Sequence, residues 1–274
     1  MDDLKFPLRG RAAVVTGGGR GLGRAMVAGL AAAGALVVAT SARSLAEVEA
    51  VAAEAPGGSV VPLRADVTRE EDCAVVAAVA VERFGRLDVL VNNAGRGMRL
   101  VSEDFLTTPT RFWEVAPSVW RDIVDTNVNG PFLMARACAS ALLASGRGRI
   151  VNVSMNHETM RRPGFSPYGP SKAALESETI IWARDLAGTG VTVNALLPGG
   201  ATETGLIPPS VGAEARARML RPSIVVPPLL WLASDASSGF TGRRIDARLW
   251  QADVPPSEAA EAASEMAGWG SSPT

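Results

Sequence analysis

The sequence is poor in several reactive side chains. Its 274 residues include one histidine, one tyrosine and two cysteines, so we expect neither a metal site nor a disulfide framework. Both cysteines, Cys73 and Cys138, stand in apolar, helix-like stretches. The formal net charge is −1, and without a basic excess to neutralise phosphates we expect no nucleic acid partner.

Long apolar runs are also missing. No stretch of ~18 residues stays free of charges and glycine clusters, so we expect no membrane-spanning helix. The first ten residues lack an apolar core, and we expect no signal peptide and a cytoplasmic location. With 47% hydrophobic residues, the chain can bury one sizeable core. We predict a single domain over residues 1–255 and a mobile or loosely docked tail at 256–274.

Short apolar runs alternate with helical patterns along the chain. The helical patterns include residues 117–143, 168–187 and 224–234. The apolar runs are continuous, as in strands that are buried on both faces of a parallel sheet, and lie at 11–16, 35–40, 59–64, 87–92, 149–154, 191–197 and 243–247. The alternation predicts an α/β fold with a Rossmann-type doubly wound parallel sheet of about seven strands and helices on both faces.

A glycine-rich loop follows the first predicted strand. Residues 16–23 read TGGGRGLG, with the spacing G-x-x-x-G-x-G. At this position in a dinucleotide fold, a pyrophosphate meets the amino terminus of the first helix. We predict that the loop binds a dinucleotide cofactor through Gly17, Arg20, Gly21, Leu22 and Gly23. The alternative is an ordinary tight turn between a strand and a helix.

The residues after the second predicted strand bear on the choice between NAD and NADP. NAD sites place an acid about 20 residues past the glycines, where it accepts from the ribose 2′-hydroxyl. Here no acid comes before Glu47, which we expect to be used in a capping box with Ser44. Arg20 and Arg43 can bind a 2′-phosphate instead, with Ser41 in the same region. We predict that NADP is preferred over NAD; the alternative is that both arginines face water.

Further motifs give the chain a resemblance to the short-chain dehydrogenase/reductase family, in its single-domain branch. They cover roughly residues 8–246 and include the glycine loop, Asp66-Val67, Asn92-Asn93-Ala94-Gly95, Asn127, Tyr168-x-x-x-Lys172 and Pro198-Gly199. The resemblance implies a homodimer or homotetramer. It also implies contacts to the adenine, its ribose and the nicotinamide from Asp66, Val67, Asn93, Ala94, Gly95, Pro198, Gly199, Ala201 and Thr202.

Tyr168 and Lys172 are the candidates for the chemistry. Four residues apart on one predicted helix, they project from the same face. An adjacent ammonium and an oxidised nicotinamide ring stabilise a phenolate, so we expect a lowered tyrosine pKa. Tyr168 then protonates a carbonyl oxygen, or deprotonates an alcohol in reverse. Only Lys5 and Lys172 are lysines among 27 basic residues, which favours a chemical need for an amine; the alternative is a half-buried tyrosine beside a surface lysine.

By resemblance, Lys172 also bonds the hydroxyls of the nicotinamide ribose, and a serine thirteen residues before the tyrosine holds the substrate oxygen. Counting back from Tyr168 gives Met155, which cannot donate a hydrogen bond. If the following segment carries one extra residue, Ser154 takes the role; if not, the serine is absent and oxyanion stabilisation is weakened. Asn156 is a further substitute. Asn127 matches the residue that organises a water relaying protons to the lysine.

Two loops are expected to shape the substrate site. Residues 96–117 are longer than the family norm and carry aromatic side chains, including Phe105, that either form an apolar lid or pack the loop onto the domain or onto a neighbouring subunit. Residues 203–222 match the family's flexible substrate loop. His157 is expected in a loop near the mouth of the site, in contact with substrate or solvent. The last strand departs from the family's Val-Asp-Gly-Gly pattern, because residues 244–250 read RIDARLW.

Together these patterns predict an NADP(H)-dependent oxidoreductase. We expect it to transfer hydride between nicotinamide and a ketone, aldehyde or secondary alcohol, with a bulky or apolar small molecule as substrate. The alternative is a cofactor-binding protein with weak or no catalysis, because Met155 occupies the position where a serine is expected.

Overall fold

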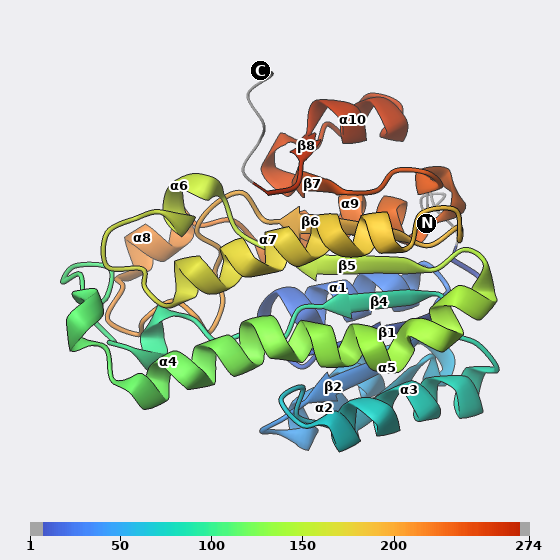
Figure 1. The fold of residues 1–274 in the computed structure, drawn as a ribbon, viewed down its shortest axis with the longest axis horizontal. Coiled ribbons are helices and arrows are strands. Elements are labelled where there is room, and N and C mark those ends of the chain that lie inside the picture. Colours follow the sequence, from blue (N-terminus) through green and yellow to red (C-terminus); the bar gives the residue numbers. More distant parts are fainter. Residues whose placement is uncertain (1–7, 269–274) are drawn as a thin grey trace.

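The strands of the sheet follow the apolar runs of the sequence. The computed structural model describes residues 8–268 and contains one sheet in the order β3-β2-β1-β4-β5-β6-β7-β8 (Figure 1). All neighbours are parallel except β7 and β8. The strands are β1 (Ala12–Val15), β2 (Leu36–Ser41), β3 (Val60–Arg64), β4 (Val89–Asn92), β5 (Arg149–Val153), β6 (Thr192–Leu197), β7 (Arg243–Asp246) and β8 (Ser264–Met266). The predicted doubly wound sheet is confirmed, with one strand more than expected.

Helices cover both faces of the sheet and bury two apolar clusters (Figure 1). One cluster lies under α1, α2 and α9, and the other lies under α3, α5 and α7. Both cysteines are buried as free thiols, and burial raises the pKa of Cys138 to about 12. The helices are α1 (Gly21–Ala32), α2 (Leu45–Glu54), α3 (Glu70–Phe84), α4 (Pro117–Val124), α5 (Gly130–Ser145), α6 (His157–Met160), α7 (Tyr168–Asp185), α8 (Ala213–Ala217), α9 (Val226–Ala233) and α10 (Pro256–Ala262).

The helical pattern predicted over residues 117–143 is interrupted. A π-helical turn over Asp125–Asn129 separates α4 from α5. Such single turns widen a helix locally and are frequent at functional sites. The turn carries Asn127, whose side chain is fully buried.

The chain after β7 is docked on the sheet, in contrast to the tail expected from the sequence. β8 pairs antiparallel with β7, with Ile245 opposite Ser264. In and after α10, Ala259, Ala260 and Ala263 are at most 3% exposed, because small side chains allow close packing. The prediction of a mobile or loosely docked tail is therefore wrong for residues 256–268, and residues 269–274 lie outside the described part.

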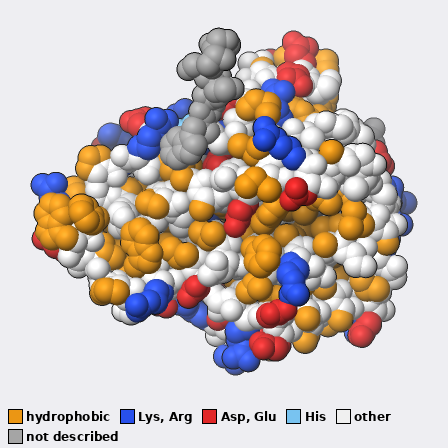
Figure 2. Space-filling model, viewed as in Figure 1, with side chains coloured by type: hydrophobic (Ala, Val, Ile, Leu, Met, Phe, Trp, Pro, Cys, Tyr) orange, Lys and Arg blue, Asp and Glu red, His pale blue; other side chains and the backbone are white. Residues whose placement is uncertain are grey.

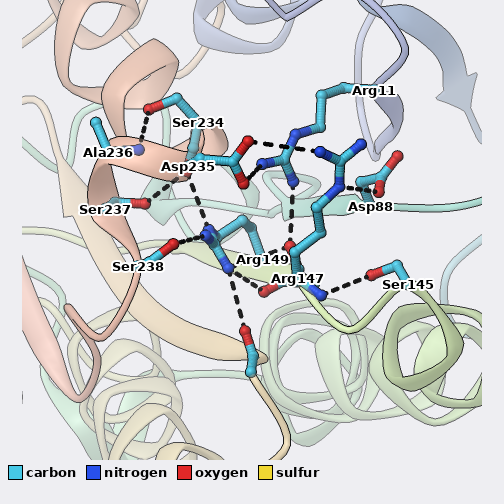
Figure 3. Close-up of polar contacts among 12 residues, drawn as sticks. Arg11, Asp88, Ser145, Arg147, Arg149, Ser234, Asp235, Ala236, Ser237 and Ser238 are labelled. Carbon is cyan, nitrogen blue, oxygen red and sulfur yellow. Dashed lines mark hydrogen bonds and ion pairs between the residues drawn. The ribbon is translucent and has the colours of Figure 1, made fainter.

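A cluster of arginines joins the amino ends of the strands (Figure 3). Arg149, the first residue of β5, is 1% exposed. Its guanidinium donates to the carbonyls of Ser234, Arg147, Gly148 and Gly190 and to the Ser238 hydroxyl. Beside it, Arg11 pairs with Asp235 and Arg147 with Asp88. The cluster fixes the end of the sheet that lies opposite the functional loops.

Candidate active site

The sheet reverses its winding direction between β1 and β4. To one side the strands run β1, β2, β3, and to the other they run β4, β5, β6, β7. In open α/β sheets, ligands bind in the crevice outside the carboxyl ends of the strands at such a switch point. The glycine loop follows β1, and the predicted Asn93, Ser154 and Pro198 follow β4, β5 and β6. The topology brings these loops to one end of the sheet.

The glycine loop is folded tightly against its own helix. A Cβ at Gly23 would lie 2.0 Å from the carbonyl oxygen of Gly17, so no larger residue fits there. Gly17 itself has a φ of 65°, in the region that favours glycine. Helix α1 begins at Gly21, and its N-cap residue Arg20 makes no side-chain capping bond. Because the first N–H groups of a helix need acceptors, this loop fits the pyrophosphate of a dinucleotide.

Asn93 braces the glycine loop from β4. Its side-chain amide donates to the carbonyls of Thr16, at 2.8 Å, and Gly17, at 3.0 Å. The N–H groups of Asn93 and Ala94 donate to the Thr16 hydroxyl, each at 3.0 Å. These bonds hold the two loops of the switch point in a fixed relation.

The region predicted to hold the 2′-phosphate contains an unexpected carboxylate. The Ser44 hydroxyl accepts from Glu47 N–H, but Ser44 N–H donates to the Ser41 hydroxyl, at 3.3 Å each. The expected capping box is thus only half formed. The Glu47 side chain lies against the glycine loop, with Oε2 3.3 Å from where a Cβ of Gly19 would stand. Arg20 and Arg43 are exposed.

The other predicted cofactor residues lie around the same crevice or support it. Asp66 accepts from the N–H and the hydroxyl of Thr68, and Val67 is buried against Gly130. After β6, Thr202 pairs with Leu220 in a short β-bridge, which closes the loop that follows Pro198, Gly199 and Ala201. Leu22 packs against the core beneath α1. Their contacts with a cofactor stay predictions.

Tyr168 and Lys172 lie in the first two turns of α7. Lys172 is 4% exposed, and its ammonium donates to the carbonyl of Val153 at 2.7 Å. The same Nζ lies 6.0 Å from the centre of the Tyr168 ring. Burial lowers the pKa of Lys172 to about 8, although Glu176 acts in the opposite direction. The interpretation of Lys172 as a surface lysine is therefore wrong.

Burial also raises the pKa of Tyr168 to about 12. The lowered tyrosine pKa that we expected is not found in the protein alone, because the loss of hydration on burial disfavours the charged phenolate. At neutral pH the phenol carries its proton. In this form Tyr168 holds the proton that a carbonyl oxygen would take, but a pKa this high makes it a weak acid unless further positive charge stabilises the phenolate.

Asn127 links the loop after β4 to the start of α7. Its amide oxygen accepts from Arg96 N–H at 2.8 Å, and its amide nitrogen donates to Arg96 O and to the Ser171 hydroxyl. The Ser171 hydroxyl in turn donates to the carbonyl of Tyr168 at 2.7 Å. A Cβ at Gly95 would lie 3.3 Å from Asn127 Oδ1 and 3.9 Å from Lys172 Nζ, so bare backbone borders both groups.

Ser154 and Met155 lie on opposite sides of the chain where it leaves β5. The Ser154 hydroxyl is buried and donates to Glu176 at 2.6 Å. Met155 packs with Tyr168 against an apolar cluster, which we call the tyrosine cluster and which consists of Met98, Phe105, Phe165, Val101 and Leu106. Met155 thus packs beside Tyr168, while the hydroxyl of Ser154 donates its hydrogen bond to Glu176. The catalytic role of Ser154 stays a prediction.

The two expected substrate loops differ in how they pack. Phe105 is buried edge-on against Phe165, with ring centres 5.8 Å apart, whereas Phe112 and Trp113 are 70% and 69% exposed. The loop over residues 203–222 contacts both the glycine loop and the loop after β4. A Cβ at Gly21 would touch Thr204 at 3.1 Å, and Arg99 donates to Gly205 O. Only part of the long loop after Gly95 therefore lines the site.

Sequence reasoning missed Glu176 and Arg244, and it misplaced His157. Glu176 is 1% exposed, Arg244 is 5% exposed, and the two form an ion pair at 3.2 Å. His157 begins α6 instead of lying in a loop, and its Nδ1 is 3.2 Å from Arg244 Nη1. One signal was available: Glu176 stands four residues after Lys172 on the same helix face.

Within residues 8–268, no group of three or more histidine, cysteine, aspartate or glutamate side chains is placed to hold a metal ion. The same residues contain no helix that is long and apolar enough to cross a membrane.

Comparison with known proteins places these features in context. The family described as short chain dehydrogenase matches residues 11–211. The 3-oxoacyl-[acyl-carrier-protein] reductase of Synechocystis sp. is 33% identical over 239 residues, which are 85% of this chain and 93% of that protein. Gluconate 5-dehydrogenase of Gluconobacter oxydans is 36% identical over 197 residues, which are 71% and 72% of the two chains.

A solved structure is also similar. It is the crystal structure of 3-ketoacyl-(acyl-carrier-protein) reductase from Brucella melitensis complexed with NADH, which superposes with a TM-score of 0.76. The two chains are 32% identical, and the match covers 87% of this chain and 97% of the other.

Proposed function

The chain belongs to the short-chain dehydrogenase family, and on that premise we propose that it transfers hydride between NADP(H) and a ketone, aldehyde or secondary alcohol. It is an oxidoreductase that uses a nicotinamide cofactor. The observation that carries the proposal is the pair of the partly buried Tyr168 and the buried Lys172, which lies beside an apolar cluster at the switch point of the sheet.

The chain's own residues supply the proton transfer. When bound, the nicotinamide cofactor supplies or accepts the hydride. The glycine loop and the amino terminus of α1 hold the pyrophosphate, and Asn93 keeps that loop in place. Tyr168, protonated at neutral pH, donates its proton to the carbonyl oxygen. The ammonium of Lys172 stabilises the phenolate that remains, and the tyrosine cluster keeps water away.

The substrate is proposed to be apolar near its carbonyl group. Met98, Phe105 and Phe165 are at most 8% exposed and form the cluster against which Tyr168 packs. Apolar pockets with few polar groups favour apolar ligands. Several similar proteins are named as reductases of 3-oxoacyl groups, so a 3-ketoacyl chain is the first substrate class to assay.

Replacing Tyr168 tests the reaction itself. Tyr168→Phe keeps the ring and removes the acid, so we expect kcat for ketone reduction to fall by about 10²–10⁴-fold. Oxidation of NADPH with a panel of 3-ketoacyl esters and aryl ketones measures it, and cofactor fluorescence on binding serves as the control for a folded cofactor site. An unchanged rate in the variant contradicts the proposal.

The preference for NADP is proposed from charge. Arg43 is exposed two residues after the end of β2, where a guanidinium can pair with a 2′-phosphate. Arg20 is exposed in the glycine loop, with its guanidinium beside Gly205. We expect Arg43→Ala to raise the KM for NADPH about tenfold and to leave that for NADH nearly unchanged. Glu47→Gln is the matched control: it removes the neighbouring carboxylate and lowers the KM for NADPH. Equal effects of Arg43→Ala on both cofactors contradict NADP preference.

A second candidate is a cofactor-binding protein with weak catalysis. It is favoured by Met155 in the surroundings of Tyr168 and by the bond of Ser154 to Glu176. Met155→Ser distinguishes the two. A serine there adds a donor for the substrate oxygen, and single donors of this kind are worth about 10²–10³ in kcat where they are well placed. A slow wild-type enzyme that gains at least tenfold supports this second candidate; a fast one that gains nothing supports the first.

The chain is also proposed to act as a homo-oligomer. Hydrophobic side chains gather on the face formed by α5 and α7 (Figure 2). Among them, Phe132, Leu143 and Ile181 are 43–51% exposed, and Phe132 lines a pocket of about 240 Å³ together with Trp182 and Leu186. Apolar patches of this kind mark interfaces between proteins. Sedimentation of Ile181→Lys against the wild type tests it, with dissociation as the expected result.

A further inference from the structure

Three charged side chains hold three consecutive residues where the chain leaves β5. Lys172 donates to the carbonyl of Val153 at 2.7 Å. Glu176 accepts from the hydroxyl of Ser154 at 2.6 Å. Arg244 donates to the carbonyl of Met155 at 2.7 Å. The segment that brings Met155 to the tyrosine cluster is therefore fixed from two elements, α7 and β7.

Arg244 is the centre of this arrangement. It is 5% exposed, and it uses its three nitrogens on different elements. Nε donates to Glu176 of α7, and Nη2 donates to Met155 O. Nη1 donates to Glu265 of β8 at 2.6 Å and contacts His157 Nδ1 of α6 at 3.2 Å. A planar guanidinium satisfies these acceptors together only in one orientation.

The arrangement extends to both the tyrosine and the end of the chain. Helix α6 packs directly on the start of α7, because a Cβ at Gly169 would lie 2.1 Å from the carbonyl oxygen of Met160. Gly169 follows Tyr168 in the chain. On the other side, Gly268 N–H donates to Glu176 Oε2 at 2.9 Å, and β8 pairs with β7. The segment after α10 is thus joined to the site by hydrogen bonds.

We propose that Arg244 is a positioning residue for substrate binding: with Glu176 and the docked segment 264–268 it fixes Met155 and α6 relative to Tyr168. This inference rests on the proposed function. Met155 cannot donate to the substrate oxygen. The substrate is therefore placed by the shape of the surface that Met155 and α6 form beside Tyr168, which we call the substrate wall. A shift of about 1 Å in such a wall costs up to about 10² in rate.

Two substitutions of Arg244 test the proposal by kinetics. Arg244→Met keeps the length of the side chain and removes all donors, while Arg244→Lys keeps the charge with one compact donor group. In both we expect the KM for the ketone to rise about tenfold, with the dissociation constant of NADPH, measured by fluorescence, changed less than about twofold. Arg136→Met is the matched control, because Arg136 is 60% exposed, pairs with Glu70 outside this arrangement, and an exposed ion pair contributes little.

A purely structural role gives a different result. Loss of folded protein lowers the apparent kcat and the melting temperature but leaves the KM of the remaining enzyme unchanged. An unchanged ketone KM in Arg244→Met overturns the proposal. A normal KM in Arg244→Lys overturns it too, since charge alone would then suffice.

His157 gives a readout that is independent of turnover. It is the chain's one histidine, so its ring protons are resolved in an NMR titration of untagged protein. Burial and the charge of Arg244 hold the pKa of His157 below its usual value, while Glu176 and Glu265 act in the opposite direction and Arg161 adds to the lowering.

We expect Arg244→Met to raise the pKa of His157, because a nearby cation is lost, and to change its chemical shift. Unchanged shifts overturn the proposed link between β7 and α6. If the wild type turns over no carbonyl compound, the proposed function fails, and the His157 titration still decides whether Arg244 holds α6.

Discussion

Arg149 and Arg244 are both almost fully buried, at 1% and 5% exposure, but they lie in different surroundings. Arg149 lies at the amino end of β5 and binds mainly backbone carbonyls and a hydroxyl (Figure 3). Arg244 lies in β7 and binds the carboxylates of Glu176 and Glu265 and one carbonyl beside the tyrosine cluster. One arginine closes the far end of the sheet, and the other faces the candidate active site.

The difference shows what a buried guanidinium does in each place. Around Arg149 the acceptors belong to loops that connect secondary structure, so its loss exposes unpaired carbonyls and weakens the fold. Around Arg244 one acceptor is the carbonyl of Met155, whose side chain packs in the tyrosine cluster, so by our proposal its loss shifts the residues beside Tyr168. We therefore expect substitutions at the first site to act on stability and those at the second to act on the ketone KM.

The largest effect is expected from Arg149→Met. Removing the donor of several buried carbonyls is expected to cost about 3 kcal/mol, which lowers Tm by roughly 5 °C in a protein of this size. Differential scanning calorimetry measures it. Well below Tm, kcat and the ketone KM should equal those of the wild type.

Glu54→Gln is the matched control away from the cluster. Glu54 and its partner Arg24 are 63% and 45% exposed, and exposed ion pairs contribute less than about 1 kcal/mol. A raised ketone KM in Arg149→Met, with the control unchanged, would show that the two ends of the sheet are coupled and would break the comparison.

The smaller effect concerns pH, because the buried cations at the two ends of the sheet, Arg149 and Lys172, lose their charges at different pH values. Burial lowers the pKa of Arg149 to about 10, while that of Lys172 is about 8. Above pH 8 the neutral Lys172 no longer stabilises the phenolate of Tyr168. We expect kcat/KM for ketone reduction to fall by up to about tenfold per pH unit there, in a pH–rate profile.

The same deprotonation does not weaken the fold. In the unfolded chain a lysine with a pKa of 10.5 still binds its proton where the folded Lys172 has lost it. The unfolded state then binds more protons, so this group contributes stability that increases as the pH rises from about 8 to 10.5. Activity that stays constant up to pH 9.5 would contradict the lowered pKa of Lys172.

Local patterns in the sequence predict most of the sheet. Continuous apolar runs gave β1 to β7, because a buried parallel strand needs apolar residues on both faces. The glycine loop could be placed as well, since only glycine fits where Gly23 meets Gly17. β8 was missed because Ser264–Met266 is short and carries no apolar run. It is a strand because it pairs with β7, and that pairing cannot be read from its own residues.

The site was harder to predict where a shift of one position along the chain changes which side chain lies beside Tyr168. Ser154 and Met155 are neighbours, but in extended chain they face opposite sides. Only the packing of α7 decides which of them meets Glu176 and which meets the tyrosine cluster. The contacts of Arg244 join residues that lie far apart in the chain, such as Glu176 and Met155, and no periodic pattern marks such pairs.

The two outer strands of the sheet have a consequence for aggregation. An exposed strand edge is a template on which another chain can pair. β8 covers the edge of β7 with only three residues, one of them Glu265. At the other side, β3 carries Pro62, which has no N–H to offer. Both edges therefore resist growth of the sheet from one copy to the next.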